Sequence, residues 1–263
     1  MNTWNTQWKN QWKKTLALGC AAFLLGGSAW GYAAPTVTAT SSAAHAANPQ
    51  DAPMPLPLTE EEVSAQQLAD AQYMALLWMR TSAEYRALCY QGYNAALMAI
   101  DRAQANPAAR SGKPLAIVLD CDETVTDNTR VMAEAAAAGN GRYDALWWRA
   151  TVHEARSEAM PGAVEFLSEV ARRGVAIFYV SNRWSEVNYE PTIDNLKALG
   201  FPSVDAEHVL LMEDRQKSDK QPRFDQIAKN YDVVVYMGDN AGDLPLGTKG
   251  MNRAARNAAI DAA

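Results

Sequence analysis

From residue 114 onward, short apolar runs alternate with segments of helical spacing, and this alternation limits the possible folds more than any other feature. The apolar runs are PLAIVL at 114–119, VAIFYV at 175–180, HVLLM at 208–212 and DVVVYM at 232–237. Helices are expected between them at 162–174, 191–200 and 222–231. Apolar strands that alternate with helices form a parallel sheet covered by helices on both faces. The sequence therefore predicts an α/β fold.

Polar side chains follow each of these strands. The segments concerned contain acids, a hydroxyl, an amide and cations: Asp120, Asp122, Ser181, Asn182, Arg183, Lys217, Lys220, Asp239 and Asp243. Because parallel sheets bind ligands beyond the carboxyl ends of their strands, we expect these side chains to converge on one site. Side chains alternate along a strand, so Cys121 should turn toward the packed side if its two neighbours face the site.

The acids at this edge predict a divalent-metal site. Clustered carboxylates repel one another and need a compensating cation. Mg²⁺ prefers oxygen ligands, which Asp120, Asp239 and Asp243 supply. A calcium loop of the EF-hand type is excluded, because Val125 and Val131 stand where that loop needs Gly and Glu. The three histidines show no spacing of zinc ligands.

The same residue types suit phosphoryl transfer, which needs a nucleophile and neutralisation of the phosphate oxygens. Asp122 lies two residues from Asp120, so both can face one edge, and Asp122 could move a proton to and from the reacting oxygens. Lys220 and Ser181 would hold the phosphate. Two alternatives stay open, with Ser181 as a helix cap and Lys220 as a surface charge.

Four ordered motifs, DCDET with its following DN, SNR, KSDKQPR and GDNAGD, resemble those of the haloacid dehalogenase (HAD) superfamily. More narrowly, they resemble the class C acid phosphatases, the lipoprotein e type of exported nucleotidase. The similarity extends over roughly residues 70–262 and includes WMRTSAEYRALCYQGYNAA, LWWR and MPGAVEFL. It implies a Rossmann-like core, N-terminal helices, and a small helical cap of about 127–160 inserted after the first strand.

The resemblance also implies an activity and a role for each motif residue. The activity is Mg²⁺-dependent hydrolysis of phosphomonoesters at acidic pH, often of 5′-nucleotides. Asp120 would be the nucleophile that forms an aspartyl-phosphate, and Asp122 the acid/base and a metal ligand through its carbonyl oxygen. Asp239 would bind the metal directly and Asp243 through water. The residues expected to bind substrate or phosphate are Thr124, Ser181, Asn182, Arg183, Lys220 and Trp148.

Two points within these assignments have alternatives. Lys220 precedes Gln-Pro-Arg as the family pattern requires, which favours it over Lys217. Trp147 and Trp148 lie in the predicted cap, where an aromatic ring could stack on a nucleobase. The alternative is that both rings only pack the cap.

The N-terminal part of the chain differs in composition from the rest. Residues 1–34 combine three lysines with a short apolar run and small residues, as in a secretory signal peptide. A lipid-modified Cys20 is the alternative, so we expect a periplasmic protein or, failing that, an outer-membrane lipoprotein. Residues 35–58 are rich in Ala, Pro, Ser and Thr and predict a flexible linker before a domain at 59–263. Thr59 with Glu62 and Thr81 with Glu84 predict the starts of two helices.

The expected partner is a small phosphorylated substrate. A net charge of −6 and the lack of a Lys/Arg stripe argue against a nucleic-acid polymer, and membrane contact is expected only through an anchor at Cys20. Two other functions stay open. One is a phosphotransferase that uses the same aspartyl-phosphate. The other is a phosphate-ligand-binding protein without turnover. This alternative stays open because family members continue beyond the segment that matches RNAAID, whereas this sequence stops at Ala263. The sequence gives no prediction of oligomeric state.

Overall fold

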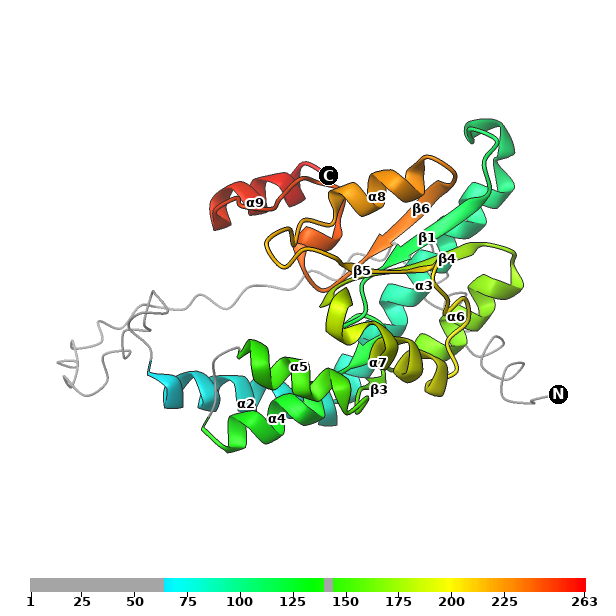
Figure 1. Ribbon diagram of the computed structural model, residues 1–263. Coiled ribbons are helices and arrows are strands. Elements are labelled where there is room, and N and C mark those ends of the chain that lie inside the picture. Colours follow the sequence, from blue (N-terminus) through cyan, green and yellow to red (C-terminus); the bar gives the residue numbers. More distant parts are fainter. Residues whose placement is uncertain (1–63, 140–143) are drawn as a thin grey trace, which may run out of the picture. The chain divides into compact units, whose positions relative to one another are not determined.

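The structure is a computed structural model that describes residues 64–139 and 144–263 (Figure 1). The predicted signal peptide, the linker, Cys20 and the helix start at Thr59 lie outside the described residues. Within the described ranges, no helix is both long enough and apolar enough to cross a membrane.

A parallel sheet of four strands forms the centre of the fold, in the order β5–β4–β1–β6. The strands are β1 (Leu115–Leu119), β4 (Ala176–Trp184), β5 (Val209–Met212) and β6 (Asp232–Met237). Ile117 in β1 lies opposite Ile177 in β4 and Val235 in β6. Every residue of β1 is buried, as expected for a central strand covered on both faces. The predicted α/β fold with a Rossmann-like sheet is confirmed.

Helices cover the two faces of this sheet unequally (Figure 1). They are α3 (Ala83–Ala105), α6 (Ala163–Arg172), α7 (Ser185–Ala198) and α8 (Gln221–Ala228). The larger core contains Ile117 and Leu119 with buried side chains of α3, α6 and α7, whereas Val118 packs with α8 on the other face. Cys121 belongs to the larger core, as the alternation of side chains along β1 predicts. It is a free thiol.

A small helical insertion follows the first strand. It contains α4 (Thr129–Ala137) and α5 (Ala145–His153) between two short antiparallel strands, β2 (Thr126–Asp127) and β3 (Glu158–Ala159). Helix α4 packs against the N-terminal helix α2 (Ala65–Thr81), and α5 packs against α7. The expected cap after the first strand is thus part of the fold.

Serines cap the helices α2 and α3. Ser64 and Gln67 form a capping box at the start of α2. Ser82 caps α3 by accepting a hydrogen bond from the amide of Tyr85. The capping box predicted at Thr81 is wrong, because Thr81 is still the last residue of α2 and its hydroxyl donates to the Leu77 carbonyl. One residue between the helices therefore ends the first and begins the second.

Two elements near the site extend beyond their predicted limits. Strand β4 continues to Trp184, so Ser181, Asn182 and Arg183 belong to the strand and do not follow it. Helix α7 begins at Ser185 and not at Pro191, which lies inside it. The remaining elements are the short 3₁₀ helices η3 (Pro107–Ala109) and η4 (Ala241–Asp243) and the C-terminal helix α9 (Arg253–Asp261).

Candidate functional site

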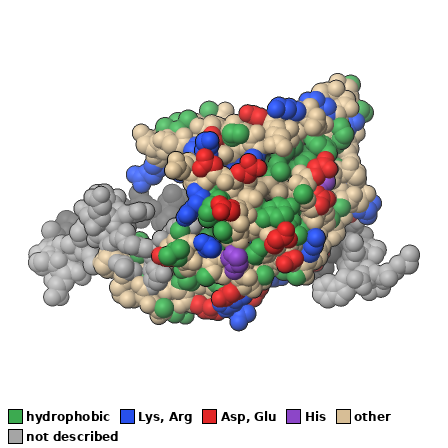
Figure 2. All heavy atoms as spheres, in the orientation of Figure 1, with side chains coloured by type: hydrophobic (Ala, Val, Ile, Leu, Met, Phe, Trp, Pro, Cys, Tyr) green, Lys and Arg blue, Asp and Glu red, His purple; other side chains and the backbone are tan. Residues whose placement is uncertain are grey.

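A cavity of about 390 Å³ opens at the carboxyl edge of the sheet. Residues that follow β1, β5 and β6, and the end of β4, all contribute to its lining, together with residues 248–251 and Arg256. Figure 2 shows acidic and basic side chains intermixed over the region that α8 and α9 occupy in Figure 1. The expected convergence of the strand ends is confirmed.

The backbone after β1 turns sharply and so presents two aspartates. The amide of Asp120 still donates to the Met237 carbonyl of β6 at 2.9 Å. The carbonyl of Cys121 then accepts from the amides of Val125 and Thr126 and from the Thr126 hydroxyl, which closes the turn. This turn requires a positive φ of 55° at Glu123, a conformation that non-glycine residues rarely adopt.

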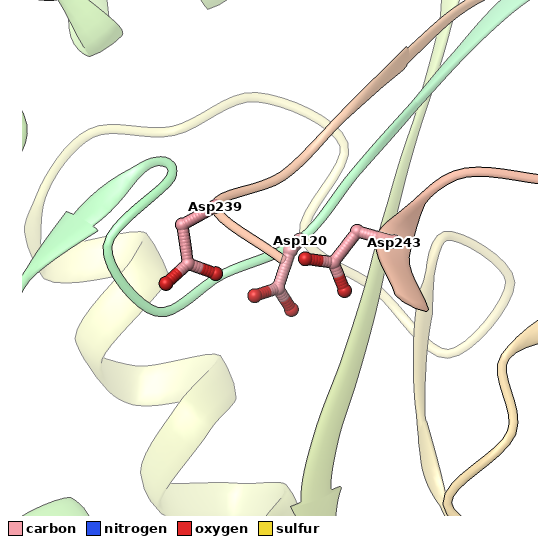
Figure 3. Close-up of side chains that lie close together, drawn as sticks. All are labelled: Asp120, Asp239 and Asp243. Carbon is pink, nitrogen blue, oxygen red and sulfur yellow. The ribbon is translucent and has the colours of Figure 1, made fainter. Parts of the chain in front are cut away.

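Three carboxylates converge at the floor of the cavity. Figure 3 shows Asp120 between Asp239 and Asp243, with all three side chains directed into the same space. One oxygen of each lies within 4.8 Å of the others. Asp243 is held at the short helix η4 to which it belongs, because its Oδ2 accepts a hydrogen bond from the backbone amide of the N-cap residue Asn240 at 2.9 Å. The residues come from three separate segments, so the tertiary fold brings them together.

Lys220 is the cation that the structure places in this group. Its Nζ lies 2.6 Å from Asp120 Oδ1 and 2.6 Å from Asp243 Oδ1, and only 3% of the side chain is exposed. Burial alone would lower the pKa of Lys220, but the two carboxylates raise it above its usual value. Lys217 is 81% exposed and pairs with Asp214, so it stands away from the site.

One lysine does not compensate three clustered acids. Burial is the main cause that raises the pKa of Asp120 to about 7, although Lys220 opposes the shift. Burial and the neighbouring Asp243 also raise the pKa of Asp239. Carboxylate oxygens at this spacing form a hard donor set, which suits a divalent cation such as Mg²⁺. The residues present therefore fit the metal that the sequence predicts.

Asp122 has a different environment. Its carboxylate accepts from Arg183 Nη2 at 2.6 Å and from Arg183 Nε at 3.1 Å, and from Asn128 Nδ2 at 2.9 Å. Burial alone would raise the pKa of Asp122, but Arg183 and Asn128 lower it below its usual value. Asp120 and Asp122 thus share one cavity and differ in both partners and proton affinity.

Arg183 does not take the position expected of a phosphate ligand. It is 2% exposed and does not line the cavity. Its remaining guanidinium nitrogen donates to the Thr192 hydroxyl at 3.2 Å. Because β4 continues through this residue, its side chain points into the packed region beside Asp122. The structure thus places Arg183 against Asp122 and outside the lining of the cavity.

The other predicted substrate-binding residues divide into two groups. Ser181 and Asn182 line the cavity, and Arg223 fixes the Asn182 side chain through a hydrogen bond of 2.6 Å. Thr124 and Trp148 do not line it. Thr124 is buried and its hydroxyl has no partner among the described residues, whereas Trp148 is half-buried on α5 beside Trp147.

Sequence reasoning missed the wall of the cavity that residues after β6 form. Thr248, Lys249, Met251 and Arg256 belong to this wall. No strand ends there, so the rule that located the other residues does not apply. The signal in the sequence was a group of three cations after the last acidic motif, Lys249, Arg253 and Arg256.

Gly238 leaves room for the side chain of Asp243 beside Asp120 and Asp239, the carboxylates that fit a divalent cation. Replacement of Gly238 by alanine is expected to displace Asp243. A Cβ at this position would overlap the side chain of Asp243, which Asn240 and Lys220 hold in place. Overpacking of this kind costs about 1–3 kcal/mol. Melting temperatures with and without Mg²⁺ should show a smaller metal-induced increase in Gly238→Ala. Gly92→Ala is the control, since a Cβ there meets nothing; equal metal responses in both variants would contradict the prediction.

The stability of the metal-free protein is expected to fall as pH rises from about 4 to about 7. The pKa of Asp120 is about 7 in the folded protein, against roughly 3.9 in an unfolded chain. Between these values the folded state holds a proton that the unfolded state has released, so rising pH favours unfolding. A metal ion binds the deprotonated form, and its stabilising effect should grow over the same range.

Melting temperatures in EDTA and in Mg²⁺ at about pH 5 and about pH 7.5 test this dependence on Asp120. Asp120→Asn removes the titrating group and should flatten the pH dependence in EDTA. The same slope in this variant and in the wild type would assign the effect to other groups.

Comparisons with known proteins agree with this geometry. Residues 36–258 match the family described as HAD superfamily, subfamily IIIB (Acid phosphatase). A solved structure of the class C acid phosphatase from Bacillus anthracis is 37% identical, with a TM-score of 0.68 over 74% of this chain and 79% of that chain. The crystal structure of a class C acid phosphatase from Bacillus anthracis with tungstate bound matches to the same extent. The range 36–258 includes every strand end that lines the cavity.

Proposed function

The chain belongs to the acid phosphatases of HAD subfamily IIIB, and is thus a phosphomonoester hydrolase, and we propose that it uses Mg²⁺ and an aspartyl-phosphate intermediate to hydrolyse 5′-nucleotides. The family match bears out the resemblance to class C acid phosphatases that the motifs indicated. We further propose that it acts after export to the periplasm, with a lipid anchor at Cys20 as the alternative.

Asp120 is the proposed nucleophile. One of its oxygens forms the bond to phosphorus while the bond from phosphorus to the ester oxygen breaks. Its position supports this role, because the side chain lies at the floor of the cavity between two further carboxylates (Figure 3). Lys220 holds Asp120 Oδ1 at 2.6 Å and so fixes the direction of the carboxylate.

Asp122 is the proposed acid and base. It gives a proton to the ester oxygen as this leaves, and then takes a proton from the water that attacks the aspartyl-phosphate. The second attack releases phosphate and restores Asp120. Arg183 and Asn128 hold Asp122 in place through four hydrogen bonds of 2.6–3.2 Å from three donor atoms, which is what a group that must meet two successive oxygens requires.

Asp120, Asp239 and Asp243 would hold the metal, with the Asp122 carbonyl as a further predicted ligand. Acid phosphatases of this superfamily use a divalent metal ion, and Mg²⁺ there would offset the repulsion between the carboxylates and a phosphate dianion. Ser181, Asn182 and Lys220 line the same cavity and are proposed to bind the remaining phosphate oxygens.

The convergence of three carboxylates at the sheet edge, two of which pair with Lys220, is the observation that carries this proposal. The test is hydrolysis of p-nitrophenyl phosphate by the purified protein at acidic pH, with Mg²⁺ and with EDTA. We expect turnover that EDTA abolishes and Mg²⁺ restores. A panel of 5′-nucleotides and sugar phosphates then tests the substrate class; equal rates on both groups would remove the nucleotide preference and leave the phosphatase activity standing.

A further inference from the structure

We infer that the preferred substrates carry a second anionic group, a carboxylate or another phosphate, which Lys249 and Arg256 bind at the α9 side of the cavity. This inference rests on the proposed phosphatase function. It adds a subsite for the leaving group that is separate from the residues that would hold the reacting phosphate.

Both cations stand on a segment that hydrogen bonds attach to the loop between Asp239 and Asp243. Thr248, next to Lys249, is 3% exposed and its hydroxyl donates to the Ala241 carbonyl at 2.8 Å. Arg256 Nη2 donates to Asn240 Oδ1 at 2.8 Å. The same Asn240 oxygen accepts from the Gly242 amide at 3.0 Å at the start of η4. The wall that carries the two cations is therefore attached to the segment between Asp239 and Asp243.

The acids of the cavity do not account for these cations. Asp120 and Asp243 pair with Lys220, and Asp122 pairs with Arg183. In residues 64–139 and 144–263, Lys249 has no hydrogen-bonding or ion-pair partner and Arg256 has no carboxylate partner. Both nonetheless line the cavity. Asp219 and Asp239 are the other acids of the lining, and among the described residues neither forms an ion pair with Lys249 or Arg256. Two positive charges thus face the cavity without being paired to any of its acids.

The size of the cavity leaves room for such a ligand. A volume of about 390 Å³ lies within the range of pockets that bind whole small molecules, roughly 300–1,000 Å³. A phosphate group alone would occupy only part of it. With the reacting phosphate at Asp120, the leaving group can extend toward Lys249 and Arg256, which line the same cavity.

Long-range attraction of any phosphate dianion is the competing explanation for two cations at a cavity wall. It differs from a subsite in one measurable respect. Attraction over a distance would act on every substrate of the same charge and would depend on the net charge of α9. A subsite would act on substrates that carry the second anion, and only through the two side chains that line the cavity.

The experiment compares matched substrates within each variant. The first pair is 3-phosphoglycerate and glycerol 3-phosphate, which differ by a carboxylate at the far carbon. The second is adenosine 3′,5′-bisphosphate and adenosine 5′-phosphate. The readout is the ratio of kcat/KM within each pair. We expect a ratio above one in the wild type for at least one pair, falling about tenfold in Lys249→Gln and Arg256→Gln, as for the loss of a charged hydrogen bond.

Arg253→Gln is the matched control, because it removes one charge from α9 at an exposed residue that does not line the cavity. An unchanged ratio in Lys249→Gln, or an equal fall in Arg253→Gln, overturns the inference. So does hydrolysis of p-nitrophenyl phosphate without a preference for the anion-bearing member of either pair. Failure to hydrolyse p-nitrophenyl phosphate at all overturns the proposed function first, so the two failures are distinguishable.

Discussion

Replacing Asp120 by asparagine is expected to lower kcat for p-nitrophenyl phosphate on the order of 10⁴-fold or more, as loss of a covalent nucleophile does in other hydrolases. The amide is similar in size to the carboxylate but is a poor nucleophile and cannot form the acyl phosphate. The loss should be in kcat and not only in KM, because the missing bond forms in the reaction step. Steady-state kinetics at saturating Mg²⁺ measure both constants.

Two further measurements separate loss of the nucleophile from loss of the fold or of the metal. Asp194→Asn makes the same chemical change at an exposed residue of α7 and should keep full activity. Acid quenching with radiolabelled substrate should trap phosphate on the wild-type protein and none on Asp120→Asn. Persistent labelling of the variant would mean that another residue is the nucleophile.

The location of the candidate site could be predicted from the sequence because it follows from topology. Apolar strands separated by helices form a parallel sheet, and the carboxyl ends of its strands share one edge. Asp120 and Asp239 follow β1 and β6, which lie side by side in the sheet, so their convergence required no knowledge of side-chain packing. The burial of Cys121 followed in the same way from the alternation of side chains along β1.

The direction of individual side chains could not be predicted where an element continued beyond its apolar run. The apolar residues of β4 end at Val180, and polar residues normally indicate the end of a strand. Here the strand continues because Ser181 and Arg183 are buried, while Asn182 between them is exposed. An arginine is stable in that position only with a carboxylate beside it, and the partner, Asp122, is 61 residues away.

The wall formed by 248–256 was missed for a different physical reason. Helix α9 has no buried residue, so packing against the core does not fix its position. It is anchored by polar contacts, Asn252 at its N-cap and Arg256 on Asn240. Contacts of this kind depend on the position of a loop in space and leave no pattern along the chain.

Replacing Arg183 is expected to have the largest effect of any change outside the residues that would contact substrate. Arg183→Gln leaves Asp122 buried without its cation, and breaking a buried pair in this way costs about 3–5 kcal/mol. The pKa of Asp122 is below its usual value in the folded protein, so the pair stabilises the fold above the ordinary aspartate pKa. The difference in unfolding free energy between variant and wild type should therefore be largest near neutral pH and shrink in acid, which denaturant titrations at several pH values can measure.

Arg183→Lys tests the positioning role apart from stability. Lysine keeps the charge but cannot hold the carboxylate from two nitrogens as Arg183 does. If Asp122 gives its proton to the leaving oxygen, poor positioning should harm alkyl phosphates most, because an alkoxide leaves slowly unless it is protonated. p-Nitrophenolate leaves readily without a proton. We therefore expect kcat/KM for glycerol 3-phosphate to fall roughly tenfold or more beyond the fall for p-nitrophenyl phosphate.

The control for this effect is Arg173→Lys. Arg173 also joins two acids, Asp101 and Glu169, but it lies at the end of α6, away from the cavity. Its replacement should cost no more than about 1 kcal/mol of stability and should leave the ratio between the two substrates unchanged. If Arg183→Lys lowers the rate on both substrates equally, the arginine supports only the fold around Asp122. A selective loss on the alkyl ester would mean that the contact between Arg183 and Asp122 acts on the protonation of the leaving group. The two substrates share the reacting phosphate and differ in how much the leaving oxygen needs a proton.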